Sequence, residues 1–79
     1  MKQTLTTEEV LRQRVQGAIR EEIRLRIVWE NAVERAKTGA PGARHAEEDA
    51  AYALGLARKQ VNEQMRQLME HCRRRYGYG

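Results

Sequence analysis

Cys72 and His71 are the only neighbouring pair in the sequence with the side-chain types of a nucleophile and its base. Adjacent residues on a helix point about 100° apart, so this pair does not form a catalytic dyad. Cys72 also continues an apolar stripe, which favours a buried structural cysteine over a reactive, redox or metal-binding one. No serine-histidine-acid order, GxSxG, phosphate-binding glycine loop or HExxH motif is present. The sequence therefore predicts a non-enzymatic protein with no catalytic residues, no cofactor and no small-molecule substrate.

His45, Glu48 and Asp49 stand at spacings of three and four, which brings three potential metal ligands onto one side of a helix. The inward-facing Glu-x-x-His motif of di-iron helix bundles is missing from the chain. Acidic residues near the start of a helix are also explained by the helix dipole, which favours negative charge there. We expect a solvated acidic turn and no metal site.

Glu22 occupies a position in an apolar helical stripe where an apolar residue is expected, and Arg26 follows four residues later. Two interpretations of this pair are open. It is an ion pair at the edge of the stripe, which stabilises a helix by roughly 0.2–0.5 kcal/mol, or it is a polar core layer inside an oligomer that fixes the register of its helices. Replacing Glu22 by leucine distinguishes the two.

Basic residues recur every seven positions in the second half of the chain and continue into a cluster that ends on a tyrosine: Lys59, Arg66, Arg73, Arg74, Arg75 and Tyr76. Cationic side chains bind phosphates and aromatic rings stack on bases, so this set is a candidate nucleic-acid site. Glu63 and Glu70 stand beside the stripe and dilute its positive field. Nucleic-acid binding is therefore the alternative function rather than the leading one.

Two helices are expected to position these residues. Thr6 and Glu9 have the spacing of a capping box, which places a helix start near Thr7. The turn-forming residues TGAPG at 38–42 end this helix. The sequence predicts a single domain with a first helix over about 7–37, a loop at 38–43, a second helix over about 44–75 and a frayed tail at 76–79.

Apolar residues in the second segment recur at spacings of three and four, which is typical of one face of an α-helix. This face begins with alanines, which allow close approach of another backbone, and continues with the larger Val61, Met65 and Leu68. A first helix folded back on it places the large ring of Trp29 over the alanines. The pattern predicts an antiparallel hairpin. A single long helix that pairs with a second chain is the alternative.

The stretch IRLRI at 23–27 alternates apolar and polar residues, which is also a strand signature. Because helix surrounds it and no turn residue bounds it, we predict helix. The middle of the first helix is then apolar nearly all round, since Ile23, Ile27 and Val28 point away from the main stripe. One neighbouring helix cannot cover all of these side chains, so the pattern predicts an additional partner.

The composition of the chain indicates the kind of cellular compartment in which the protein works. The chain has 79 residues, a net charge of +4, one cysteine and no apolar run near the roughly 20 residues of a membrane span. A lone cysteine without a secretory signal indicates a reducing compartment, so we expect a soluble, cytoplasmic protein without membrane contact. Small domains without disulfides or metals usually gain stability by association.

These patterns predict an all-α fold, an antiparallel two-helix hairpin completed as a four-helix bundle by dimerisation or by docking on a partner. The layout resembles that of Rop, the small plasmid RNA-binding protein built as a dimer of helical hairpins, and is similar to phage- or plasmid-encoded accessory proteins, without a shared motif. We predict a small regulator, inhibitor or adaptor that binds protein. Its predicted interface combines apolar, aromatic and arginine side chains: Arg20, Ile23, Arg24, Ile27, Val28, Trp29 and Arg35.

Overall fold

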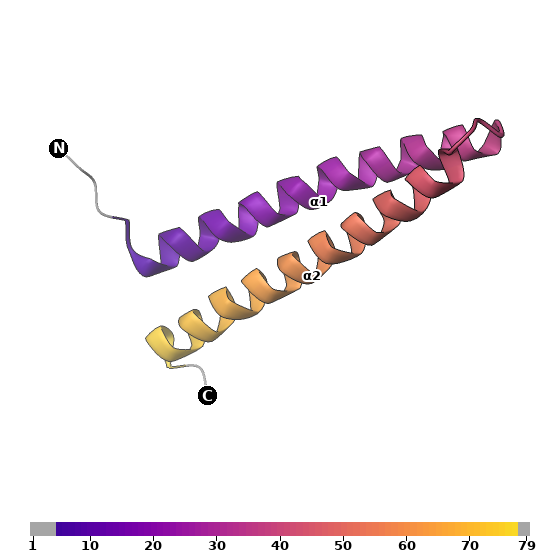
Figure 1. Ribbon diagram of the computed structural model, residues 1–79. Helices are drawn as coiled ribbons and strands as arrows, with labels where there is room; N and C mark the ends of the chain where they lie inside the picture. Colours follow the sequence, from indigo (N-terminus) through magenta and orange to yellow (C-terminus); the bar gives the residue numbers. More distant parts are fainter. Residues whose placement is uncertain (1–4, 78–79) are drawn as a thin grey trace.

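The computed structural model describes residues 5–77, which form two long helices joined as a hairpin (Figure 1). α1 spans Thr7–Lys37 and α2 spans Ala43–Tyr76. The predicted all-helical hairpin is confirmed, and the alternative of a single long helix is wrong because the chain reverses between α1 and α2. Residues 23–27 lie inside α1, so the strand alternative is also wrong. Over the described residues, neither helix contains a stretch long and apolar enough to cross a membrane.

α1 begins where the capping box places its start. Thr6 has extended backbone angles (φ −70°, ψ 160°), and its hydroxyl oxygen accepts a hydrogen bond from the backbone N–H of Glu9 at 3.1 Å. The N–H groups of a first helical turn have no partners within the helix, so this cap satisfies one of them. Glu8 in the first turn and Lys37 in the last turn complement the helix dipole.

Two glycines shape the connection between the helices. Gly39 (φ 72°) and Gly42 (φ 73°) both adopt the left-handed conformation, in which a side chain would meet steric strain. The Thr38 hydroxyl donates a hydrogen bond to the carbonyl oxygen of Arg35 at 2.6 Å and so satisfies one carbonyl at the end of α1. α2 then begins at Ala43, one residue earlier than predicted.

The far end of α2 also differs from the prediction. Tyr76 is the last residue of α2, and Gly77 (φ 68°) follows in the left-handed conformation, with its N–H bonded to the carbonyl oxygen of Arg73 at 3.0 Å. The helix thus extends one residue into the tail predicted at 76–79, and the Tyr76 hydroxyl bonds to Glu8 across the hairpin. Residues 78 and 79 of the predicted tail lie outside the described part of the chain.

Two contacts define the register of the antiparallel pair. Glu22 lies against Arg58, and Glu8 lies against Cys72. Glu8 and Glu22 are fourteen residues apart on α1, and their partners Cys72 and Arg58 are also fourteen residues apart on α2. The register of the two helices is therefore constant over about four helical turns. Positions on the two helices can therefore be compared directly along the whole hairpin.

The core between the helices is thin and rich in alanine. Within the described residues, the buried apolar side chains are Leu11, Ala32, Ala43, Ala50, Leu54 and Ala57. All but Leu11 lie in the half of the hairpin next to the connection, where small side chains let the backbones come close. The helices diverge toward their free ends (Figure 1), where Val61 and Leu68 are only half-buried. No side chain among residues 5–77 is fully buried, so the hairpin alone has no closed core.

Candidate protein-binding surface

A carboxylate between two guanidinium groups stands near the middle of the hairpin. Glu22 on α1 lies 3.7 Å from Arg26, one turn further along the same helix, and 3.6 Å from Arg58 on α2. The Glu22 side chain is 18% exposed, whereas those of Arg26 and Arg58 are 47% and 60% exposed. We call these three residues the Glu22 cluster. It holds two positive charges against one negative charge.

In the single hairpin, the Glu22 cluster lies at the edge of the contact between α1 and α2. The two arginine side chains reach Glu22 from different helices and leave much of their own surface to water. This arrangement fits the edge ion pair that the sequence allows. The polar core layer requires a second chain over the cluster and stays a prediction.

Three isoleucines on α1 form an exposed apolar row beside the Glu22 cluster. Ile19, Ile23 and Ile27 follow one another at intervals of four residues, which stacks them along one side of the helix. They are 37%, 42% and 54% exposed. Ile19 lies three residues before Glu22 and Ile23 three residues before Arg26, so these two isoleucines border the cluster. Ile27 directly follows Arg26 and points about 100° away from it.

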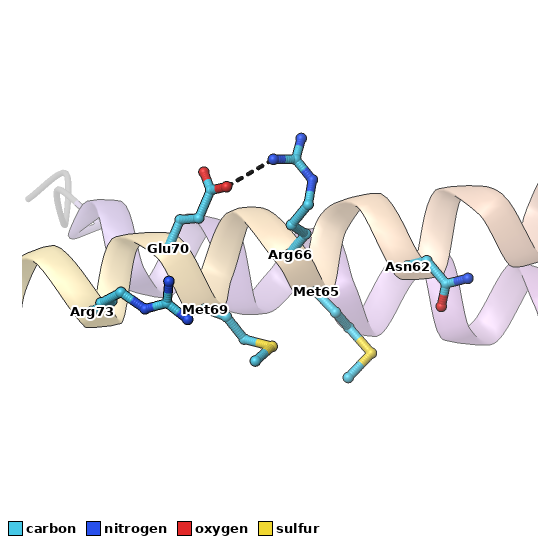
Figure 2. Close-up of a pocket in the computed structure, with 6 residues that line it drawn as sticks. All are labelled: Asn62, Met65, Arg66, Met69, Glu70 and Arg73. Atoms are coloured by element: carbon cyan, nitrogen blue, oxygen red, sulfur yellow. Dashed lines mark hydrogen bonds and ion pairs between the residues drawn. The ribbon is translucent and has the colours of Figure 1, made fainter. Parts of the chain in front are cut away.

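A second exposed apolar row lies on α2. Met65 and Met69, one turn apart, are 44% and 60% exposed. They line an open hollow whose polar members are Asn62, Arg66, Glu70 and Arg73. Figure 2 shows both methionine side chains pointing to the same side of α2, away from Arg66 and Glu70. Asn62 also borders Glu22 and Arg58, so this methionine row continues from the Glu22 cluster.

The residues predicted to form one interface do not all come together. Ile23 and Ile27 share the isoleucine row, whereas Val28 lines a separate hollow with Asn31, Ala32, Arg35 and Ala46. Val28 and Arg35 therefore belong to another part of the surface. Met69 also belongs to the surface but was not among the predicted interface residues, although its spacing from Asn62 and Met65 is that of one helix face.

The other predicted interface residues are less available for binding than their types suggest. Trp29 is half-buried rather than exposed. Arg20 and Arg24 are exposed, but Arg24 donates two hydrogen bonds to Glu21, at 3.1 and 2.5 Å. The bond from Arg24 lowers the pKa of the Glu21 carboxyl. Among the arginines on α1 that the sequence singled out, Arg26 is the one that belongs to the Glu22 cluster. Through Glu22, this cluster connects α1 to Arg58 on α2.

The basic stripe predicted as a nucleic-acid site is interrupted in its centre. Arg66 donates hydrogen bonds to Glu63 at 2.6 Å and to Glu70 at 2.8 Å. The bond to Glu63 is the main reason why the pKa of the Arg66 guanidinium is raised. Lys59 is exposed one repeat earlier on the stripe. Two carboxylates beside Arg66 offset its charge, so phosphate groups gain little there.

The basic cluster at the end of α2 is more open. Arg73 and Arg74 are exposed and form no ion pair with any residue among 5–77. The Arg75 guanidinium lies 6.0 Å from the centre of the Tyr76 ring, which is at the outer limit of a cation–π contact. Tyr76 itself is held by Glu8. The cations at 73–75 are thus the more available part of the predicted nucleic-acid site.

Glu8 joins the first turn of α1 to the last turns of α2. One of its carboxylate oxygens accepts a hydrogen bond from the Tyr76 hydroxyl at 3.1 Å and a second from the Cys72 thiol at 3.5 Å. The bond from Tyr76 is the largest influence that lowers the pKa of the Glu8 carboxyl. Burial is the main influence that raises the pKa of the Cys72 thiol, which keeps it protonated and able to donate. Cys72 therefore has a structural contact and little nucleophilic character.

The first turn of α2 contains no acidic residue, and Glu48 and Asp49 of the following turn are open to solvent. His45 Nε2 and Asp49 Oδ2 are 3.8 Å apart, and their side chains are 81% and 74% exposed. Glu48 is exposed as well. Among residues 5–77, no group of three histidine, cysteine, aspartate or glutamate side chains is placed to hold a metal ion.

No family model matches the chain, and no curated protein or solved structure matches it either. The features of this surface that bear on function are therefore its two apolar rows and the charges between them.

Proposed function

We propose that this protein is a small, non-enzymatic cytoplasmic regulator, inhibitor or adaptor that acts by binding another polypeptide over its exposed apolar rows. The observation that carries the proposal is the imbalance between buried and exposed apolar side chains. Six apolar residues of the described chain are buried and four of these are alanines, whereas ten large apolar or tyrosine side chains are at least 37% exposed.

Exposed apolar rows are the usual signature of an interaction surface in a small protein. Burial of apolar area contributes roughly 25 cal/mol per Å², so the isoleucine and methionine rows offer a binding partner a favourable surface. A second copy of the hairpin would complete a four-helix bundle, and a larger protein would cover the rows with helices of its own. Arginine and methionine, both present in the surface, are enriched at such interfaces.

The substitution Ile23→Asp tests this proposal, because Ile23 is exposed and its replacement leaves the buried core intact. Tyr52→Asp is the matched control, since Tyr52 is 72% exposed on α2 but lies in neither row. We expect light scattering to show an oligomer that Ile23→Asp dissociates and Tyr52→Asp preserves, or a pull-down from the native cells to capture a protein that only Ile23→Asp loses. A monomer that captures the same proteins as the unsubstituted chain and as both variants contradicts the proposal.

The exposed cations at 73–75 and the net charge of +4 support a second candidate function, that of a small basic regulator that binds RNA or DNA. Phosphate contacts release counterions, so the affinity of such a protein falls steeply with salt. We expect the triple variant Arg73→Gln, Arg74→Gln, Arg75→Gln to lower affinity and flatten the salt dependence if this function is correct. Absence of binding to any nucleic acid at low salt contradicts it.

A further inference from the structure

The isoleucine row, the Glu22 cluster and the methionine row form one surface that runs obliquely across the hairpin. On α1, Arg26 is paired with Glu22 and stands one turn after Ile23. On α2, Asn62 lines one hollow with Arg58 and another with Met65. The register places the isoleucine row beside the middle of α2, while the methionine row lies closer to the free ends of the helices. The Glu22 cluster and the methionine row are therefore continuous, Ile19 and Ile23 border the cluster, and the three parts lie along a diagonal.

This surface has an excess of positive charge. Counting Glu63, which Arg66 also binds, its charged side chains are four arginines and three glutamates: Arg26, Arg58, Arg66, Arg73, Glu22, Glu63 and Glu70. Glu22 serves both Arg26 and Arg58, and Arg73 has no ion-pair partner within the described residues. Arg66 has two carboxylates, so the surface as a whole carries one positive charge more than it has negative charges, and this excess lies among Arg26, Arg58 and Arg73.

The charge excess distinguishes two possible binding partners for this surface, a second copy of the chain and a different protein. A second copy of the chain docked face to face would bring the same positive excess against this surface, and like charges brought together at an interface are costly. A partner with carboxylates beside its apolar residues would supply the missing negative charges to Arg26, Arg58 and Arg73. Charge complementarity therefore favours an acidic partner over self-association through this surface.

The shape of the surface favours a helix as the docking element. Two antiparallel helices leave a groove between their exposed flanks, and a third helix packs into such a groove with side chains spaced by three and four residues. Methionine side chains are flexible and polarisable, so Met65 and Met69 adjust to the shape of a bound apolar face (Figure 2).

We propose that this oblique surface binds an amphipathic helix of another protein whose apolar stripe is bordered by aspartate or glutamate. The inference rests on the proposed protein-binding function and narrows it to one surface and one partner chemistry. Arg26, Arg58 and Arg73 select the acidic border, and the isoleucine and methionine rows bind the apolar stripe.

Three synthetic peptides test the proposal on the full-length chain. Each has about 20 residues with leucines at the same helical spacing, and they differ only in that the border residues are all glutamate, all glutamine or all lysine. Isothermal titration measures their affinities. We expect the glutamate peptide to bind about tenfold or more tightly than the glutamine peptide, and the lysine peptide to bind most weakly.

Matched variants locate the site. Arg26→Gln with Arg58→Gln should remove most of the preference for the glutamate peptide, and Met69→Asp should weaken all binding. Arg14→Gln with Arg35→Gln makes the same change in net charge at exposed arginines outside the oblique surface and should leave the preference unchanged. All of these side chains are exposed, and circular dichroism confirms that each variant keeps its helix content.

Several results overturn the proposal. It is wrong if the three peptides bind equally well, if none binds, or if the Arg14 and Arg35 variant loses the preference as fully as the Arg26 and Arg58 variant does. It is also wrong if the chain alone forms a dimer that Met69→Asp dissociates, because a second copy then occupies the surface. If such a dimer forms, the broader protein-binding function still stands. If the chain is a monomer and neither Ile23 nor Met69 is needed for any association, both the broader function and this proposal are contradicted.

Discussion

The Tyr76 hydroxyl lies 3.1 Å from a carboxylate oxygen of Glu8, and this contact joins the last residue of α2 to the first turn of α1. It stands at the end of the hairpin where the helices diverge and where buried side chains are few. The Cys72 thiol donates to the same oxygen from one turn earlier on α2. A polar cluster thus holds together the part of the molecule that apolar packing holds least.

Tyr76→Phe should loosen this end of the hairpin. The substitution keeps the aromatic ring beside Arg75 and removes only the hydroxyl that donates to Glu8. We expect the backbone amides of the last turns of α2 to exchange with solvent several-fold faster, because that segment opens more often. Hydrogen exchange followed residue by residue measures this effect. Equal exchange rates in the two proteins would show that the hydroxyl contact has no stabilising role.

Stability should fall in mildly acidic solution. The hydrogen bond from Tyr76 lowers the pKa of Glu8 in the folded chain below its ordinary value of 4.5. A carboxyl with a lowered folded pKa contributes stability that is present above its unfolded pKa and is lost as the pH falls through its folded pKa. We expect the melting temperature to decrease between about pH 5 and about pH 3, and Glu8→Gln to reduce that decrease. Glu21 and Glu63, whose pKa values arginine bonds lower, contribute the remainder.

Cys72 should react slowly with alkylating agents in the folded chain. Burial and the hydrogen bond to Glu8 both raise the pKa of its thiol, so little thiolate is present at neutral pH. We expect iodoacetamide to modify the folded chain several-fold more slowly than the chain unfolded in guanidinium chloride. Glu8→Gln should speed the folded reaction, because it removes the nearby negative charge. A rate as fast in the native state as in the unfolded state would contradict this account.

Local signals in the sequence were sufficient to predict the fold. The hydroxyl of Thr6 caps α1 as its spacing from Glu9 predicts, and the turn-forming residues at 38–42 separate the helices. The alanine-rich stretch of α2 supplies most of the buried residues. The end of α2 was predicted less well, because Tyr76 is held in the helix by a partner on α1 that no local pattern identifies.

The candidate surface was predictable only in part. Helical spacing gives the rows on each helix, and the register of the hairpin brings Glu22 near Arg58. Which flank of α1 lies beside which flank of α2 depends on how each helix rotates about its axis in the packed pair. That rotation separates Val28 from Ile23 and places the methionine row next to the Glu22 cluster. Side-chain volumes along the whole contact determine it, so a pattern of apolar residues alone does not.

Replacing Gly42 and Gly17 by alanine should change the stability of the hairpin in opposite directions. Gly42 has a left-handed backbone (φ 73°) and Gly17 lies inside α1, and an added methyl group meets no atom within 4 Å at either position. Gly42→Ala should therefore destabilise the hairpin by about 1–2 kcal/mol through backbone strain alone. Gly17→Ala should stabilise it by about 0.5–1 kcal/mol through helix propensity. Urea unfolding of both variants measures the two effects, and shifts of the same sign would show that the connection is not formed as described.

Glu22→Leu should raise the stability of the hairpin and make its surface more apolar. The substitution breaks two ion pairs with exposed arginines, each worth roughly 0.2–1 kcal/mol. Burying most of a leucine side chain at this 18% exposed position contributes roughly 1.5–3 kcal/mol, so burial outweighs the lost pairs by about 1 kcal/mol. Urea unfolding measures that gain. Light scattering on the same variant shows whether the continuous apolar surface now pairs with a second copy.

Glu22→Gln keeps the shape and removes the charge, so it should lower stability slightly. If Glu22→Leu is less stable than the unsubstituted chain, the two ion pairs of the Glu22 carboxylate contribute more free energy than burial of the leucine side chain, and the prediction is wrong.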